Sequence, residues 1–185
     1  MQLYFITGNN NKFTEVSAII PRLERLNLAP DEIQSLDPKV VIEHKLAQAA
    51  NIHSGAFIVE DTSVGFNCLG GLPGTLIKWF LDTIGPQGIA DLVLRYNDHS
   101  ATVLTTIGYR NMRGEIHYFL GHSTGQIVAP QGTSGFGFDP VFVADGQSRT
   151  SAELSAHEKN AISARGIAAR KLSAFLESEI QTVKT

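Results

Sequence analysis

A polar turn near the N-terminus is the first place where this sequence could do chemistry. The segment TGNNNK, Thr7 to Lys12, connects the apolar run LYFI to an amphipathic segment. Such a turn exposes backbone N–H groups at a helix N-terminus beside the Lys12 cation, and this arrangement suits a phosphate. The GxxxxGK[ST] pattern of the common nucleotide-binding loop is absent. A strand-to-helix turn that binds nothing is the alternative interpretation of this stretch.

Two adjacent carboxylates, Glu60 and Asp61, follow an apolar strand predicted at Ala56–Val59. Consecutive side chains of a strand point to opposite faces, so we do not expect Glu60 and Asp61 to act as a matched pair. One of them could face a cleft and hold a water or Mg²⁺, which prefers carboxylate and phosphate oxygens. Glu32, in the segment APDEIQ, is a second candidate metal ligand. A solvated strand end is the structural alternative for the Glu60–Asp61 pair.

The loop FGFD, Phe136 to Asp139, is a third candidate. Aromatic rings on either side of a glycine can stack on a flat base while backbone groups contact the edge of that base. A turn with two core phenylalanines is the alternative. Three cations, Lys45, Lys159 and Arg165, lie in predicted helical segments, where each taken alone is typical of a solvated side chain.

Other reaction classes find little support in the sequence. The six histidines show no HxxxH spacing and the chain has no cysteine cluster, so no zinc motif is present. The GxSxG elbow of acyl-transfer enzymes is also absent. Cys68 is the only cysteine, which excludes an internal disulfide and fits a reducing compartment. We expect Cys68 to be a small buried apolar residue and not a nucleophile.

The overall composition bounds the class of protein. With 43% hydrophobic and 18% charged residues, the chain of 185 residues can bury a sizeable core in one domain. A net charge of -3 argues against a role in coating nucleic acid. The N-terminus has no basic region followed by a long apolar run, and no segment approaches the ~20 apolar residues of a membrane span. We therefore expect a cytoplasmic protein that binds neither nucleic acid nor membrane.

Alternating strands and helices must position the candidate residues. Apolar runs predict strands at Leu3–Thr7, Ala56–Val59, Ala101–Tyr109, Glu115–His122 and Pro140–Val143, with the third and fourth forming a hairpin. Helices are predicted at Asn11–Ile20, after the Asp37-Pro38 cap, and over TLIKWFLDTI as far as Gly85-Pro86. Further helices are predicted at Ile89–Tyr96 and after the Ser155–Glu158 capping box. The last predicted helix is the C-terminal segment, with Ala168, Leu172, Phe175 and Leu176 on one face.

These elements predict a fold of the α/β class, in which a twisted mixed sheet is flanked by helices and a cleft forms where strand ends meet. We expect a single domain over residues 1–185, with a β-rich lobe approximately within 101–129.

Four motifs occur in order along the chain: TGNNNK, EDTSVGFNCLGGLPGTLIKWF, GFGFDPVF and AELSAHEKNAISARG. Together they closely resemble the inosine triphosphate pyrophosphatase family, also called the Ham1-like family, over nearly the whole chain. The resemblance implies Mg²⁺-dependent hydrolysis of ITP, dITP and XTP to the nucleoside monophosphate and pyrophosphate. It also implies a homodimer and a two-lobed α/β fold with the nucleotide in the groove between the lobes.

The resemblance also implies roles for individual residues. Asp61 is similar to the family's metal ligand or general base, and Glu32 to a metal ligand. The implied substrate-binding residues are Thr7, Gly8, Asn9, Asn10, Asn11, Lys12, Lys45, Thr62, Lys78, Phe136, Gly137, Phe138, Asp139, Lys159 and Arg165. The chain departs from the family where Ser163-Ala164-Arg165 replaces the usual Ser-His-Arg. This departure concerns recognition of the base and leaves the phosphate chemistry unaffected.

Two other functions are alternatives to hydrolysis of ITP, dITP and XTP. A Maf-like pyrophosphatase would act on other modified nucleotides, but the EKNAIS and GFGFD motifs argue against it. A sensor would bind a nucleotide without hydrolysing it. Retention of Glu32 and Asp61 argues against a sensor, because a sensor could lose its metal-binding acid.

Overall fold

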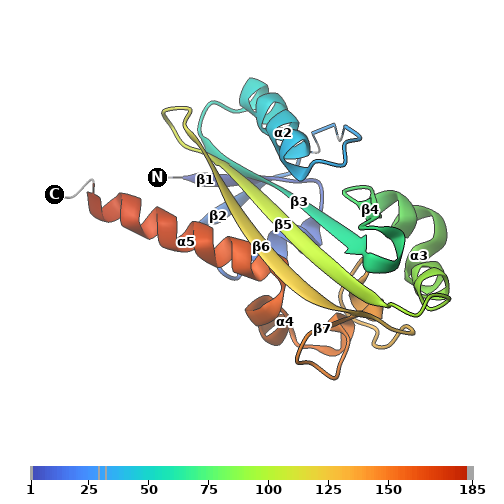
Figure 1. Ribbon diagram of the computed structural model, residues 1–185. Coiled ribbons are helices and arrows are strands. Elements are labelled where there is room, and N and C mark those ends of the chain that lie inside the picture. Colours follow the sequence, from blue (N-terminus) through green and yellow to red (C-terminus); the bar gives the residue numbers. More distant parts are fainter. Residues whose placement is uncertain (1, 29, 32, 183–185) are drawn as a thin grey trace.

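One mixed sheet organises the chain, in a computed structural model that describes residues 2–28, 30–31 and 33–182 (Figure 1). The strand order is β2-β1-β3-β5-β6-β7, and β4 pairs with β3 outside this path. The strands are β1 (Leu3–Ile6), β2 (Leu23–Leu26), β3 (Ala56–Phe66), β4 (Pro73–Gly74), β5 (Ser100–Arg110), β6 (Ile116–Ile127) and β7 (Phe142–Ala144). Strand β1 pairs in parallel with β2 and β3, whereas β3, β5, β6 and β7 pair antiparallel. The predicted mixed sheet is confirmed.

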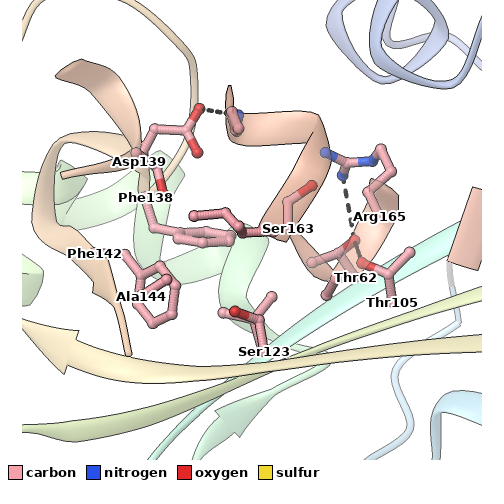
Figure 2. A pocket seen from close by; sticks show the side chains of 14 residues that line it. Thr62, Thr105, Ser123, Phe138, Asp139, Phe142, Ala144, Ser163 and Arg165 are labelled. Carbon is pink, nitrogen blue, oxygen red and sulfur yellow. Dashed lines mark hydrogen bonds and ion pairs between the residues drawn. The ribbon is translucent and has the colours of Figure 1, made fainter. Parts of the chain in front are cut away.

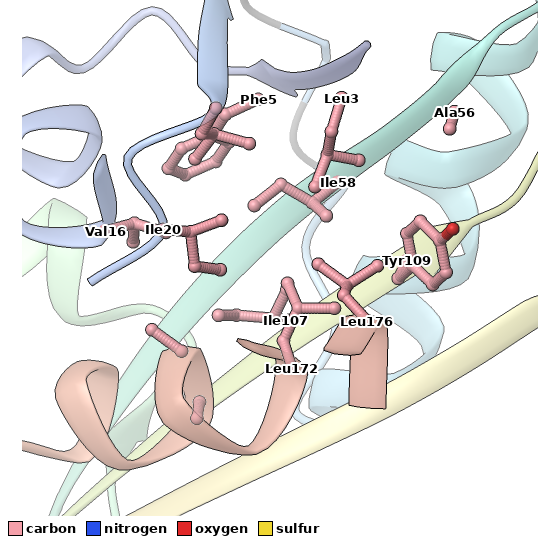
Figure 3. Packing of buried hydrophobic residues seen from close by; sticks show 13 residues of the cluster. Leu3, Phe5, Val16, Ile20, Ala56, Ile58, Ile107, Tyr109, Leu172 and Leu176 are labelled. Carbon is pink, nitrogen blue, oxygen red and sulfur yellow. The ribbon is translucent and has the colours of Figure 1, made fainter. Parts of the chain in front are cut away.

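Helices cover both faces of this sheet. They are α1 (Asn10–Ser17), α2 (Pro38–Ile52), α3 (Ile77–Val93), α4 (Ala156–Ile162) and α5 (Ala164–Thr182). Helices α1 and α5 pack on one face through a buried cluster that includes Phe5, Val16, Ile58, Ile107 and Leu172 (Figure 3). Helix α2 packs on the opposite face against Ile6, Phe57 and Val59. The sheet therefore carries one layer of helices on each side.

Side-chain caps begin the helices that matter for the site. Asn9 accepts hydrogen bonds from the backbone N–H groups at the start of α1, and Asp37 accepts one at the start of α2, where Pro38 follows it. Ser155 and Glu158 form the predicted capping box of α4. These caps confirm three of the predicted helix starts to within a residue.

Glycine lets α5 approach the sheet closely. A Cβ atom at Gly121 in β6 would lie 1.8 Å from the carbonyl oxygen of Ala164, so a larger residue would push the first turn of α5 outward. That turn carries Arg165. Gly121 therefore helps to place Arg165 against β3 and β5.

The structure corrects two predicted elements and confirms a third. Strand β3 continues to Phe66, well beyond Val59, so Glu60 and Asp61 lie within a strand and not at its end. The predicted break at Gly85-Pro86 is confirmed: Gly85 has the non-helical angles φ 66° and ψ −179°, and the helical stretches before and after it together make up α3. Strand β7 begins at Phe142, after a single 3₁₀ turn over Asp139–Val141, because Pro140 has no N–H for a ladder hydrogen bond.

The segment predicted as a β-rich lobe, 101–129, contains most of the β5–β6 hairpin. This hairpin continues the central sheet through the pairing of β3 with β5. A division into two lobes with a groove between them stays a prediction.

Candidate active site

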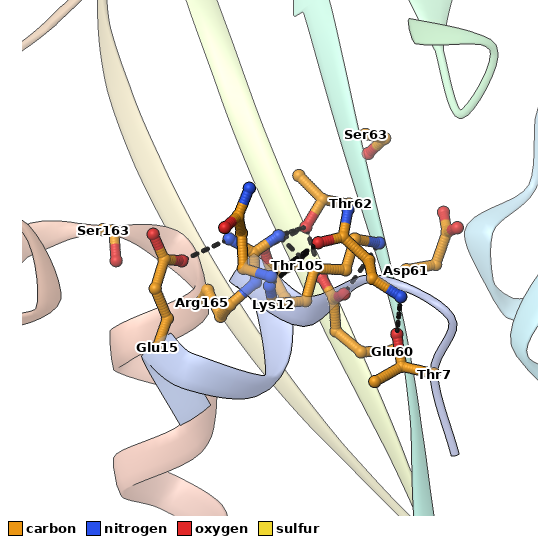
Figure 4. A network of polar contacts seen from close by, with 12 residues as sticks. Thr7, Lys12, Glu15, Glu60, Asp61, Thr62, Ser63, Thr105, Ser163 and Arg165 are labelled. Carbon is orange, nitrogen blue, oxygen red and sulfur yellow. Dashed lines mark hydrogen bonds and ion pairs between the residues drawn. The ribbon is translucent and has the colours of Figure 1, made fainter. Parts of the chain in front are cut away.

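Glu60 is the centre of a buried ionic cluster on the face that α1 and α5 cover (Figure 4). Its side chain lies 2.8 Å from Lys12 Nζ through Oε2 and 3.3 Å from Arg165 Nη2 through Oε1. The hydroxyl of Thr62 donates to the same Oε1 and lies 2.8 Å from the Thr105 hydroxyl on β5. A carboxylate that is only 5% exposed is thus held by two cations and a hydroxyl.

The charge state of Glu60 follows from these neighbours. Burial alone would raise the pKa of Glu60, but Arg165 and Lys12 outweigh burial and lower this pKa to about 2. Glu60 is therefore ionised at neutral pH. Its ion pairs hold the Lys12 and Arg165 side chains in fixed positions beside β3.

Asp61 lies on the opposite face of β3. Its Oδ1 accepts a hydrogen bond from Lys45 Nζ of α2 at 2.8 Å. Its Oδ2 is buried and has no hydrogen-bond partner within the described residues. Burial raises the pKa of Asp61, and Lys45 opposes this effect. Asp61 thus offers a free carboxylate oxygen with increased affinity for a proton or a cation.

A second cluster joins α1 to the C-terminal helices. Glu15 of α1 lies 2.6 Å from Lys159 Nζ and 2.5 Å from Arg165 Nη1. Lys159 Nζ also lies 4.7 Å above the centroid of the Phe136 ring, and Arg165 Cζ lies 5.4 Å from that centroid. Two cations that can only donate hydrogen bonds therefore sit beside a flat aromatic ring.

The FGFD loop is braced from within. Asp139 accepts the Phe136 N–H at 2.7 Å and the Lys159 ammonium at 2.5 Å, which ties the loop to α4. Gly137 has φ +65°, a conformation that favours glycine. Phe138 packs edge-on against Phe142, with 6.0 Å between the ring centroids. Asp139 and Phe138 therefore stabilise the loop itself, in addition to the ligand binding predicted for them.

A small cavity of about 30 Å³ lies between this loop, the α4–α5 junction and the sheet (Figure 2). Its apolar wall includes Phe138 and Ala164, and its polar wall carries the hydroxyls of Thr62, Thr105 and Ser123. Ala164 and Arg165 both line this cavity, so a larger residue at position 164 would fill part of the space beside Arg165.

The TGNNNK turn has the expected form of a strand-to-helix loop. The Thr7 hydroxyl accepts the Asn9 N–H at 3.1 Å, and Asn9 Oδ1 accepts the N–H groups of Asn11 and Lys12 at 2.9 and 3.1 Å. Lys12 leaves the first turn of α1 toward Glu60. The loop therefore presents a cation next to the ionic cluster, while binding by Gly8, Asn10 and Asn11 stays a prediction.

Most of the predicted site residues meet around β3. On the face that α1 and α5 cover, the residues that come together are Lys12, Thr62, Lys159, Arg165 and the FGFD loop. Lys45 and Asp61 meet on the opposite face of β3. Lys78 lies exposed in the first turn of α3. The predicted ligand Glu32 lies outside the described residues. Within residues 2–28, 30–31 and 33–182, no group of three or more His, Cys, Asp or Glu side chains could hold a metal ion.

Sequence reasoning missed Glu15, Thr105 and the central role of Glu60. Glu15 follows Lys12 by three residues, and this helical spacing could have placed both side chains on one face of α1. Thr105 carries no local signal, since only the register of β5 beside β3 brings it to Thr62. No helix within the described part of the chain is long and apolar enough to cross a membrane.

Comparison with known proteins supports a family assignment. A model of the Ham1 family matches residues 3–175. The chain is 41% identical over 181 residues to an inosine triphosphate pyrophosphatase of Schizosaccharomyces pombe, covering 96% of each chain. It is 44% identical over 179 residues to an inosine triphosphate pyrophosphatase of Fusarium vanettenii, covering 95% of this chain and 96% of the relative.

Solved structures agree on the fold. A HAM1 protein from Coxiella burnetii superposes with a TM-score of 0.75 at 24% identity, covering 96% of this chain and 100% of the other. A nucleoside-triphosphatase or dITP/XTP pyrophosphatase from Mycobacterium abscessus superposes with a TM-score of 0.69 at 25% identity, covering 95% and 99%. With the family model matching nearly the whole chain, this protein belongs to the Ham1 family.

Proposed function

We propose that this protein is a Mg²⁺-dependent pyrophosphatase that hydrolyses ITP, dITP and XTP to the nucleoside monophosphate and pyrophosphate, which would remove non-standard purines from the nucleotide pool. The observation that carries the proposal is the unpartnered Oδ2 of buried Asp61, one residue from a carboxylate held by Lys12 and Arg165. A carboxylate oxygen without a hydrogen-bond partner, near cations held in fixed positions, suits attack on a polyphosphate. The names of the relatives point to the same reaction class.

The cations match the charge of the substrate. A purine nucleoside triphosphate brings about four negative charges into the site, so fixed positive charge must stabilise the growing charge of the leaving group. Lys12 projects from the polar turn and Lys45 approaches from the other face of the sheet. We assign both lysines to the phosphates, with Lys12 nearer the leaving pyrophosphate.

Asp61 also fits a Mg²⁺ site. A hard cation takes oxygen ligands, and Oδ2 of Asp61 is a buried carboxylate oxygen without a hydrogen-bond partner within the described residues. Asp61 would hold the ion together with Glu32 and phosphate oxygens. When bound, the ion supplies positive charge that polarises the phosphates and stabilises pyrophosphate as it leaves.

The reaction is a displacement at the α-phosphorus. Water forms a new P–O bond there, the bond to the bridging oxygen toward the β-phosphorus breaks, and pyrophosphate leaves with the electron pair. In the alternative in which Oδ2 of Asp61 does not hold the ion, we assign the proton of the attacking water to Asp61, because burial raises its pKa and so increases its basicity.

Base recognition is assigned to the second cluster. Hypoxanthine and xanthine carry an oxygen at C6, which accepts hydrogen bonds, whereas adenine carries an amino group there, which donates them. Lys159 and Arg165 only donate, and Phe136 lies beside them as a surface for stacking. This pairing favours the oxo bases. Rejection of guanine must act on its 2-amino group instead.

We further propose that the protein works as a cytoplasmic homodimer. Leu36, Leu72 and Trp79 are large apolar side chains exposed by 65%, 47% and 56%. The Thr75 hydroxyl donates to the Ser35 carbonyl, which holds the segment of Leu36 against the loop that begins α3. Burial of these side chains by a second copy would remove apolar area from water. Sedimentation equilibrium tests this, and Trp79→Glu should yield monomers.

One experiment tests the reaction itself. Purified protein is given ITP, XTP, dITP, ATP and GTP, each with Mg²⁺ and with EDTA, and pyrophosphate and orthophosphate are assayed separately. We expect pyrophosphate and the monophosphate from ITP, XTP and dITP, and no turnover with EDTA. Orthophosphate with a nucleoside diphosphate would place the cleavage at the wrong bond, and tight binding without turnover would indicate a sensor.

A further inference from the structure

Arg25 of β2 holds the TGNNNK turn from the side of the strand edge. Its Nε donates to the Thr7 carbonyl at 3.2 Å and its Nη2 to the Gly8 carbonyl at 2.8 Å. Its Nη1 donates to Asn10 Oδ1 at 3.0 Å, and Nη2 donates also to Asn27 Oδ1 at 2.8 Å. One guanidinium therefore binds Thr7 and Gly8 of the turn and Asn10, the first residue of α1.

These bonds orient the backbone N–H groups of the turn. In a trans peptide the carbonyl and the following N–H point in opposite directions, and the peptides of this turn are trans. With the carbonyls of Thr7 and Gly8 facing Arg25, the N–H groups of Gly8 and Asn9 face away from it. The Asn9 N–H is bound by the Thr7 hydroxyl, and the Gly8 N–H has no partner within the described residues. The turn is thus fixed with an available donor on the side away from β2.

The charge of Arg25 is not cancelled by these contacts. All four acceptors are neutral oxygens, two from backbone carbonyls and two from asparagine amides. A guanidinium stays protonated at all ordinary pH values. By contrast, the charges of Lys12 and Arg165 are shared with Glu60. Arg25 therefore adds positive potential to the turn, which favours an anion there.

We propose that Arg25 is a positioning residue for polyphosphate. It holds the TGNNNK turn in its binding conformation before substrate arrives, and it contributes positive charge on the β2 side of the turn. This inference rests on the proposed function, in which the turn contacts the phosphates. Preorganisation of this kind improves binding because less conformational freedom is lost when the ligand binds.

The test uses full-length protein and inorganic tripolyphosphate, a probe that has no base. Arg25→Ala should speed amide exchange in residues 7–12 and leave exchange in β3 unchanged. Loss of charge-assisted hydrogen bonds predicts a dissociation constant for tripolyphosphate raised by roughly 10-fold or more, with a rise in KM for ITP. Arg25→Lys keeps the charge without the fork, so it should speed exchange equally but weaken binding less. Arg22→Ala, which removes a cation three residues earlier, is the matched control and should change neither measurement.

The outcomes separate the two proposals. Wild-type protein that neither binds tripolyphosphate nor releases pyrophosphate from ITP would end the proposed function. Wild-type activity combined with normal loop exchange and normal affinity in Arg25→Ala would overturn the role of Arg25. Faster exchange throughout β3 would overturn it also, since it would indicate a general structural role. If Arg25→Ala does not fold, normal exchange and affinity in Arg25→Lys give the same negative result.

Discussion

Glu60 and Asp61 are consecutive residues of β3, yet their carboxylates face opposite sides of the sheet and meet cations from different helices. Glu60 is bound by Lys12 of α1 and Arg165 of α5, whereas Asp61 is bound by Lys45 of α2. Glu60 Oε1 accepts a hydrogen bond from Thr62 and Oε2 forms an ion pair with Lys12, whereas Asp61 Oδ2 has no hydrogen-bond partner within the described residues. The two acids therefore differ in role: Glu60 organises cations, and Asp61 is available for chemistry.

Asp61→Asn keeps the shape of the side chain and removes its charge. If Asp61 accepts the proton of the attacking water or holds the metal ion, turnover of ITP should fall at least ~10²-fold. Steady-state kinetics measure this, and circular dichroism checks that the fold is retained. Glu43→Gln, an exposed position on α2, serves as the control. Near-normal turnover in Asp61→Asn would transfer the role to Glu60 or Glu32.

Glu60 should make the fold sensitive to acid. Its pKa is about 2 when folded and 4.5 ordinarily, so its stabilising effect is complete above the ordinary value and is lost as pH falls toward 2. Linkage predicts that the free energy of unfolding loses about 3 kcal/mol from this group over that interval. Urea unfolding at pH 6, 4.5, 3 and 2 measures the loss.

Glu60→Gln tests the assignment of this acid sensitivity. The variant should be less stable at neutral pH by about 3 kcal/mol, because Lys12 and Arg165 lose their shared carboxylate. It should also show a shallower pH dependence below pH 4.5. Glu158→Gln is the control. The pKa of Glu158 is likewise lowered to about 2, but its side chain is exposed to solvent, so this substitution should change the stability less than Glu60→Gln does. Equal slopes in Glu60→Gln and wild type would show that other carboxylates carry the acid sensitivity.

The predictable part of this molecule is the part with local signals. Asp37 before Pro38 and the Ser155–Glu158 box are read from neighbouring residues, and both caps are confirmed. The full length of β3 was not predictable in the same way. Its residues are buried on both faces, so the alternation of polar and apolar side chains that marks a strand is weak.

The ionic cluster was harder still to predict. Glu60 meets Lys12 and Arg165 across large separations in sequence, so no local pattern distinguishes it from a solvated acid. The motifs of the Ham1-like resemblance located most members of the site, because each motif marks a position in the chain. The motifs do not predict which residues contact one another. Glu15 and Arg25 lie outside the assigned positions and became visible through their hydrogen bonds.

Lys12→Ala should reduce kcat at least as much as it raises KM. The Lys12 side chain is 20% exposed and contacts Glu60, so it can reach a ligand while staying anchored. Charge grows on pyrophosphate during the reaction, and a cation that meets this growing charge acts mainly on the transition state. Lys171→Ala is the control, because Lys171 binds only the Leu120 carbonyl in the contacts described. A raised KM with an unchanged kcat would assign Lys12 to uniform substrate binding.

Ala164→His should tighten binding of ITP without changing the order of substrates. Ala164 is 2% exposed and lines the cavity beside Arg165. The Ham1-like resemblance implies a histidine at this position. One additional neutral hydrogen bond is worth about 0.5–1.5 kcal/mol, which corresponds to roughly a 2–10-fold change in affinity. Ala164→Leu, which adds similar bulk without a hydrogen-bonding group, is the size control. Competition assays with ITP, XTP and ATP measure the order, and a reversal in favour of ATP would contradict the assignment of selectivity to Arg165.

Arg165 should carry the preference for ITP over ATP. Burial lowers the pKa of Arg165, but Glu60 and Glu15 outweigh it and raise this pKa, so the group stays protonated and only donates. The amino group of adenine would then face a donor without an acceptor, a buried mismatch that predicts discrimination of ~10⁴-fold or more in kcat/KM. Arg165→Gln supplies both a donor and an acceptor and should collapse the ratio, whereas Arg165→Lys keeps donors only and should preserve much of it. Because both substrates are measured on the same preparation, the ratio is insensitive to partial unfolding of either variant. If the wild-type protein hydrolyses ATP as efficiently as ITP, this account of base recognition is wrong and the substrate assignment fails with it.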